Sequence, residues 1–182
     1  MRKALLIIDI QNDYFPGGAM ELEGSDEAAV RGACLLQMFR QKSLTVIHIQ
    51  HVMNRPGATF FLPDTQGVEI HPALAPLAGE PVFQKHFPNS FRETPLLDYL
   101  RRHDIGELVI AGMMTHMCID TTTRAAADLG FHCLLAHDAC ATRSLSFAGA
   151  TVSAQNVQAA FMAALNGLFA TVLSVEDICS TI

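Results

Sequence analysis

Short apolar runs alternate along this chain with longer stretches in which apolar residues recur every three or four positions. The runs predict β-strands over residues 4–9, 44–49, 81–85, 107–111, 132–136 and 171–173. Such an alternation is typical of an α/β fold with three layers, in which a parallel sheet is covered by helices on both faces.

The helical stretches carry start and stop signals. Ser25 is placed to cap a helix over residues 26–41, and Thr94-Pro95 begins a second helix that ends in Arg101-Arg102-His103. A third helix is expected over residues 119–129. A fourth helix carries an apolar stripe that we expect to face the core, formed by Val157, Ala160, Phe161, Ala164, Leu165 and Leu168.

Residues 51–80 break this pattern. They show no clear period and contain several prolines and glycines, so they predict one long loop. Loops of this length in small domains are usually functional or disordered. The apolar Phe60-Phe61-Leu62 inside the segment favours a packed lid.

Composition narrows the possible classes of protein. The chain has 182 residues, 50% of them hydrophobic, and we expect one domain over residues 1–182. A net charge of -6 and scattered cationic residues disfavour nucleic-acid binding. The first apolar run is too short for a signal sequence, and no run has the length of a membrane span. Five cysteines without a C-x-x-C pair favour reduced thiols and a cytoplasmic location.

Reactive side chains follow three of the predicted strands, at the sheet edge where α/β proteins bind ligands. Asp9 ends an apolar run, so its carboxylate must be paired or hydrogen-bonded. Lys85 follows Phe83 and precedes Phe87, so its ammonium group needs an anion nearby. Cys118 stands at a strand-to-helix junction, where free N–H groups and the helix dipole lower the pKa of a thiol.

Each of these residues also has a structural interpretation when it is taken alone. Asp9 could cap a turn, Lys85 could extend its stem over phenylalanines, and Cys118 could fill the core. Together they form a chemically consistent set: a thiol nucleophile, a carboxylate that accepts its proton, and an ammonium group that orients the carboxylate or acidifies the thiol directly. Histidines are rival bases that the sequence does not rank, and among them His86 and His116 are candidates for substrate contact.

Three ordered motifs then resemble the isochorismatase-like cysteine hydrolases. They are Leu-Leu-Ile-Ile-Asp-Ile-Gln-Asn-Asp-Tyr-Phe at residues 5–15, Gln-Lys-His-Phe-Pro-Asn-Ser-Phe at residues 84–91, and Ala-Gly-Met-Met-Thr-His-Met-Cys at residues 111–118. The resemblance implies a six-stranded parallel sheet, which we expect in the Rossmann-like order 3-2-1-4-5-6. It implies a catalytic triad of Asp9, Lys85 and Cys118. It also implies a cis peptide between Met113 and Met114, which turns the Met114 N–H to join that of Cys118 in an oxyanion hole.

Departures from individual family members narrow the activity. Nicotinamidases carry a zinc-binding Asp-x-His after the second strand, and residues 48–53 lack that pair, although His51 and His71 remain. We therefore predict no metal and no cofactor. Isochorismatases cleave a vinyl ether without needing a thiol, so Cys118 favours acyl transfer. The expected reaction is hydrolysis of a small amide-like C–N bond through a thioester.

The partner of this reaction is expected to be a small molecule, and the sequence does not identify it. Phenylalanines of the motifs and of the long loop could form an apolar pocket, although each is also a common core residue. The resemblance favours a homo-oligomer, a dimer or larger. The substrate-binding candidates are Gln11, Phe15, Phe60, Phe61, His86, Phe87, Phe91 and His116.

Two other functions remain open at this point. One is an isochorismatase-type vinyl-ether hydrolase, which would retain its rate without the Cys118 thiol. The other is a non-enzymatic thiol redox sensor or ligand-binding protein, in which Cys133 or Cys140 would pair with Cys118.

Overall fold

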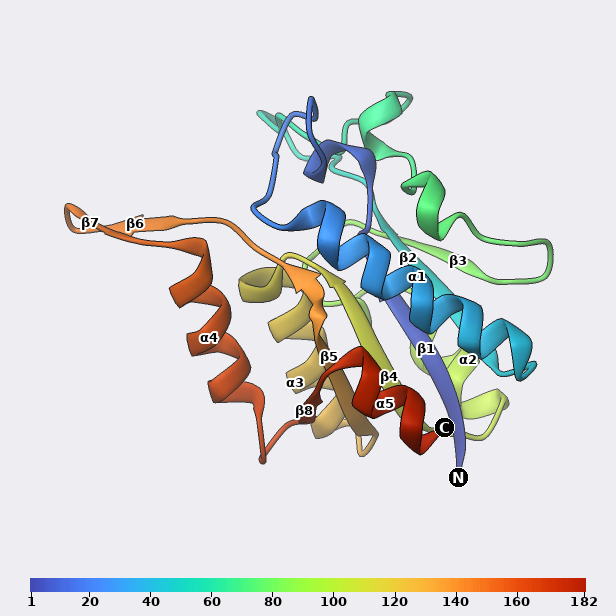
Figure 1. Ribbon diagram of the computed structural model, residues 1–182. Coiled ribbons are helices and arrows are strands. Elements are labelled where there is room, and N and C mark those ends of the chain that lie inside the picture. The colour runs from blue at the N-terminus through green and yellow to red at the C-terminus, as the bar shows by residue number, and fades with distance from the viewer.

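The computed structural model describes residues 1–182. Six parallel strands form one sheet (Figure 1). The strand order is β3-β2-β1-β4-β5-β8. The strands are β1 (Arg2–Ile8), β2 (Thr45–His51), β3 (Val82–Lys85), β4 (Ile105–Met113), β5 (His132–Ala141) and β8 (Thr171–Leu173). The predicted order is confirmed, since the sixth predicted strand is β8 and a short hairpin adds two strands before it.

Alternate residues of the central strand β1 pack into two separate cores. Leu5 and Ile7 belong to one apolar cluster, whereas Leu6 and Ile8 belong to the other. Because successive side chains of a strand point to opposite faces, a strand buried on both faces is apolar throughout. This is why β1 is a continuous apolar run.

Helices cover both faces of the sheet, as predicted (Figure 1). One face is covered by α1 (Ser25–Gln41) and α5 (Val175–Thr181), which supply Leu36, Phe39 and Ile178 to the first cluster. The other face is covered by α2 (Leu96–Arg102), α3 (Asp120–Asp128) and α4 (Ala154–Leu165). None of the five helices combines the length and apolar character that a bilayer crossing requires.

Several element boundaries differ from the prediction. Ser25 is the first residue of α1 and not its cap, because Gly24 takes the cap position with a φ of 76°. Strand β4 continues through Gly112 to Met113, so this glycine lies within the strand and not in a turn. A Cβ at Gly112 would stand 1.9 Å from the Ile8 carbonyl oxygen, so only glycine fits there.

The segment after β5 differs most from the prediction. Strands β6 (Leu145–Phe147) and β7 (Ala150–Val152) form a hairpin that projects from the body beside α4, and Phe147 at its tip is 87% exposed (Figure 1). The predicted stripe of α4 is wrong at three positions: Ala160, Ala164 and Leu168 are exposed. Leu168 lies beyond the helix, which ends at Leu165, so helical spacing does not determine its direction.

The long loop between β2 and β3 is packed against the body, as its apolar centre suggested. It contains two short 3-10 helices, Gln66–Val68 and Pro72–Leu74. Phe61 and Leu74 are fully buried in the same cluster as α1.

Candidate active site

The carboxyl edge of the sheet brings together the three residues that the sequence singled out. Asp9 follows β1 directly, Lys85 is the last residue of β3, and Cys118 lies in a π-helical turn (Thr115–Ile119) between β4 and α3. Parallel strands end at the same edge, and β1 lies between β2 and β4 in the sheet. Residues far apart in sequence therefore meet at one point.

Asp9 and Lys85 form a buried ion pair. Lys85 Nζ lies 2.8 Å from Asp9 Oδ2, and both side chains are 0% exposed. The same ammonium group donates a hydrogen bond to the Pro88 carbonyl at 2.9 Å, whereas neither Asp9 oxygen receives a hydrogen bond of good geometry. The Asp9 carboxylate thus retains lone pairs that can accept a proton. Its backbone has a φ of 52°, a conformation that costs most residues about 1–2 kcal/mol.

His51 completes this buried group. Its Nδ1 lies 3.8 Å from the Cys118 sulfur and 3.7 Å from Asp9 Oδ2, while its Nε2 has no partner. The Gln11 side chain holds the His51 backbone from both sides: it accepts from the His51 N–H at 2.7 Å and donates to the His51 carbonyl at 2.9 Å. His51 is therefore fixed next to the thiol. From the sequence, His51 is only a rival base and, with His71, a possible metal ligand; the structure pairs it in register with Lys85, at the end of β2.

Burial controls the electrostatics of the site. It raises the pKa of the Cys118 thiol, the neighbouring Asp9 raises it further, and the opposing effect of Lys85 is smaller. The expectation that the helix junction lowers this pKa is therefore wrong. Burial would also raise the pKa of Asp9, but Lys85 and His51 outweigh it, so the pKa of Asp9 is lowered. The pKa of Lys85 is raised, because Asp9 and Cys118 outweigh the effect of burial. These directions favour a protonated thiol beside an ion pair.

Asp9, His51 and Cys118 also have the donor atoms of a possible metal site, since these atoms lie within 4.8 Å of one another. The Lys85 ammonium group, 2.8 Å from the Asp9 oxygen, already supplies the positive charge that this carboxylate needs. A divalent cation would stand beside that charge and be repelled by it. The donor set therefore fits a metal ion poorly. His71 is not part of the group, because its ring stacks on Phe15 and caps a 3-10 helix instead.

One feature of the backbone before Cys118 agrees with what the resemblance implied. The peptide between Met113 and Met114 is cis. Met114 and Cys118 both line the cavity described next, so their N–H groups are candidates for an oxyanion hole.

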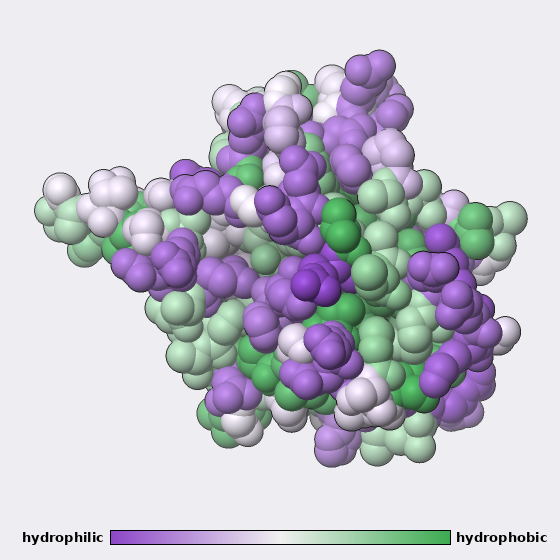
Figure 2. Space-filling view, viewed as in Figure 1, coloured by the Kyte–Doolittle hydropathy of each residue, from purple (hydrophilic) through white to green (hydrophobic).

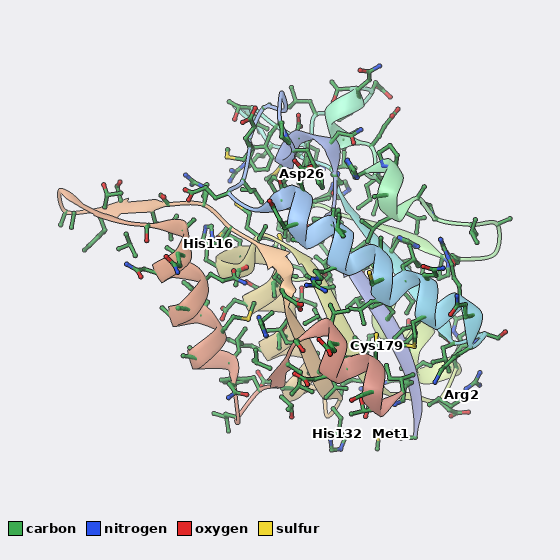
Figure 3. The ribbon with its side chains drawn as sticks, viewed as in Figure 1. Met1, Arg2, Asp26, His116, His132 and Cys179 are labelled. Atoms are coloured by element: carbon green, nitrogen blue, oxygen red, sulfur yellow. The ribbon has the colours of Figure 1, made fainter.

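A cavity of about 330 Å³ opens over the Cys118 sulfur. Among the residues predicted to contact a substrate, Phe60, His86, Phe87 and His116 line it. His116 lies near the base of the projecting hairpin (Figure 3), where its Nδ1 is 2.6 Å from the Thr142 hydroxyl. The His86 Nδ1 donates to the Val52 carbonyl at 2.8 Å, which leaves Nε2 free to face a ligand.

The other predicted substrate residues do not line this cavity. Gln11 is buried and uses its amide to hold His51, as described above. Phe15 stacks on His71, Phe61 packs edge-on against Tyr14, and Phe91 stacks on Phe131. These aromatic residues do not line the cavity because they pack into the apolar clusters. Phe15 and Phe61 belong to the cluster of α1, and Phe91 packs against the other cluster.

Several lining residues were not predicted. Tyr14, Met20 and Met53 contribute apolar surface, and Arg55 and Arg143 contribute positive charge. Tyr14 belongs to the first motif and could have been found there, whereas the two arginines lie in irregular segments that carry no periodic signal.

The carboxyl edge of this Rossmann-like sheet thus carries a buried thiol, a carboxylate and an ammonium group, an arrangement that suits a hydrolase. The family model described as Isochorismatase domain matches residues 3–177. The chain belongs to the isochorismatase family.

Individual relatives agree with this assignment. The chain is 49% identical over 176 residues to the uncharacterized isochorismatase family protein YddQ of Bacillus subtilis, covering 97% of this chain and 98% of that protein. A crystal structure from Oleispira antarctica, described as an isochorismatase hydrolase, is similar with a TM-score of 0.95 at 50% identity, over 98% of this chain and 96% of that one. A nicotinamidase of Escherichia coli is 29% identical over 175 residues, covering 76% of this chain and 82% of the relative.

Proposed function

We propose that this protein hydrolyses a small amide-like C–N bond through a thioester on Cys118. The observation that carries the proposal is that Cys118 lines the cavity and lies close to an Asp9–Lys85 ion pair that no solvent reaches. The nicotinamidase relative supports amide chemistry, since its name describes an amidase.

In the proposed reaction the Cys118 thiol transfers its proton to Asp9 as the sulfur attacks the carbonyl carbon. The N–H groups of Met114 and Cys118 stabilise the oxyanion. Asp9 then donates the proton to the leaving nitrogen, the C–N bond breaks, and ammonia or an amine leaves. A water molecule activated by Asp9 hydrolyses the thioester, which releases a carboxylic acid and restores the thiol.

Because burial raises the pKa of the Cys118 thiol, this mechanism needs a base at the moment of attack. We propose that Lys85 acts by orienting Asp9 and by stabilising its charge. We further propose that His51 positions the thiol, because its Nδ1 faces both the sulfur and the Asp9 carboxylate.

A vinyl-ether hydrolase is the second candidate, and the position of the thiol argues against it. Proton transfer to a vinyl ether needs only the Asp9 acid, whereas Cys118 lines the cavity together with Met114. A redox sensor is disfavoured as well. Burial raises the pKa of Cys133 and of Cys140 to about 12, and it raises that of Cys118, which disfavours the thiolates that disulfide formation needs.

Ammonia release from a panel of small primary amides tests the proposal. Wild type is compared with Cys118→Ala and with Cys133→Ala, a matched variant of a buried cysteine that does not line the cavity. We expect the Cys118 variant to lose activity at least about 1,000-fold and the Cys133 variant to retain it. Full activity in Cys118→Ala would contradict the covalent mechanism.

We also propose that the whole chain forms one catalytic domain that assembles as a homo-oligomer in the cytoplasm. Exposed apolar side chains before and after α4, Phe147 of the hairpin and Leu168, suit a subunit interface. The hairpin appears as a pale and green arm in Figure 2. Sedimentation of wild type against Phe147→Ser tests this assembly, and a wild-type monomer would contradict it. Five free cysteines suit a reducing compartment.

A further inference from the structure

The charge of the cavity lining is one-sided. Fifteen residues line the cavity, and none of them is an aspartate or a glutamate. Two of them are arginines, Arg55 and Arg143. The chain as a whole has 18 acidic residues and only 12 lysines and arginines. The cavity lining therefore has the opposite charge balance to the rest of the protein.

Neither arginine has an anionic partner within the protein. Four other arginines each have a carboxylate within 4 Å: Arg31 with Asp138, Arg40 with Glu80, Arg92 with Glu93, and Arg124 with Asp120. Arg55 and Arg143 form no ion pair and donate no side-chain hydrogen bond. Their guanidinium groups are exposed and free to bind a ligand.

The positive charge of Arg143 acts on His116, another residue of the cavity lining. Burial lowers the pKa of His116, and the charge of Arg143 lowers it further, so His116 is neutral at physiological pH. A neutral imidazole beside a guanidinium group can accept or donate a hydrogen bond without adding charge. This leaves the two arginines as the fixed cations of the cavity.

Much of the remaining lining is apolar. Tyr14, Phe60 and Met114 contribute apolar surface, His51 lies next to the thiol, and the small volume limits the ligand to a short molecule. A guanidinium group binds carboxylate and phosphate oxygens through paired N–H donors. A ligand that suits this cavity therefore has a reacting amide at one end, a short apolar body and an anion at the other end.

We propose that Arg55 and Arg143 form an anion subsite, so that the substrate is a small amide that carries a carboxylate or phosphate group. This inference rests on the proposed amidase function for the reacting end of the substrate. The anion subsite itself can be tested by binding, without turnover.

The binding experiment uses Cys118→Ala protein and calorimetry with succinamate, a short amide with a carboxylate. Its neutral methyl ester is the matched ligand. We expect succinamate to bind at least 10-fold more tightly than the ester, and this preference to fall about 10- to 100-fold when Arg143→Gln or Arg55→Gln is added. Arg31→Gln, which removes the same charge from α1 outside the cavity, should leave it unchanged. Equal binding of acid and ester, or an effect of Arg31→Gln as large as that of the cavity variants, would overturn the proposal.

Inhibition of binding by acetate and by inorganic phosphate distinguishes the two kinds of anion. Competition by either one that disappears in the Arg143 and Arg55 variants supports the subsite, and the stronger competitor identifies the group. Failure of both anions to compete would overturn it.

Turnover separates this inference from the proposed function. If wild type hydrolyses amides, we expect Arg143→Gln to raise KM for succinamate with little change in kcat, and to leave KM for the ester unchanged. If the amide groups of succinamate and of its methyl ester are hydrolysed with equal KM, the anion subsite is overturned and the amidase proposal stands. If succinamate binds tightly through the arginines but no amide is hydrolysed, the amidase proposal is overturned and the anion subsite stands.

Discussion

The buried ion pair between Asp9 and Lys85 allows a sharp prediction about stability. Replacing Lys85 with methionine keeps most of the side-chain volume and leaves the Asp9 carboxylate alone in a site that is 0% exposed. Removing one partner of a buried pair costs about 3–5 kcal/mol, because the remaining charge is uncompensated. No hydrogen bond of good geometry reaches the Asp9 oxygens, so His51, at 3.7 Å, is the main group left to stabilise this charge.

For a chain of 182 residues this loss corresponds to a Tm decrease of roughly 6–20 °C. Urea unfolding followed by circular dichroism measures the free energy. The double variant Asp9→Asn/Lys85→Met removes the charge as well, and asparagine accepts the positive φ of residue 9 better than most residues. We therefore expect the double variant to recover most of the stability that Lys85→Met loses.

The pH dependence gives a second measurement on the same variants. The lowered pKa of Asp9 means that the pair stabilises wild type above the range in which an ordinary aspartate titrates, and that this stability is lost as the pH falls through the lowered pKa. The raised pKa of Lys85 means that the stability is also lost at strongly alkaline pH. In Lys85→Met the isolated carboxyl has a raised pKa, so its deficit should shrink as the pH falls. A loss below about 1 kcal/mol in Lys85→Met, or a double variant as unstable as the single one, would refute this reasoning.

Three further predictions concern single contacts. His51→Gln should lower kcat about 10- to 100-fold and change the pH profile of kcat, whereas a purely structural role would lower the amount of folded enzyme and leave the profile unchanged. Dialysis against a chelator should leave activity unchanged, because Lys85 already compensates the Asp9 charge; a loss that zinc restores would disprove this. Glu80→Gln should destabilise the long loop at neutral pH, because hydrogen bonds from Arg40 hold the pKa of Glu80 at about 2. Since this stability is lost as the pH falls toward that value, the two proteins should converge in acid unfolding curves, and parallel curves would contradict the assignment.

The sheet could be predicted because strands that are buried on both faces consist of apolar residues. β1 and β4 are buried on both faces, and their apolar runs stand out from the flanking sequence. The hairpin β6–β7 could not be found in this way, because all of its strand residues except the half-buried Leu145 are exposed and so show no pattern of burial. The last helix, α5, was missed although Ser174 caps it and Glu176 and Asp177 stand in its first turn, which is a readable start signal.

The site was predictable to the extent that strand ends determine it. Asp9 and Lys85 end strands, so topology alone brings them to one edge. The aromatic residues were harder, because a phenylalanine in a motif can face the cavity or support it from behind. Phe60 lines the cavity and its neighbour Phe61 is buried behind it, a difference that depends on how the long loop folds.

The protonation state of Cys118 could not be predicted from its position, and it provides the last test. A helix junction lowers the pKa of a thiol only where water or charges solvate the thiolate. Here the residue is 3% exposed, and burial dominates. A thiolate–imidazolium pair would react with iodoacetamide at a rate independent of pH near neutrality. A protonated thiol should instead react faster with each step in pH, without a plateau up to about pH 9. Mass spectrometry of the labelled peptides measures this rate, with exposed Cys34 as an internal comparison. A plateau for Cys118 near pH 7 would show that the resting site holds a thiolate, and Asp9 would then have no proton to accept during attack.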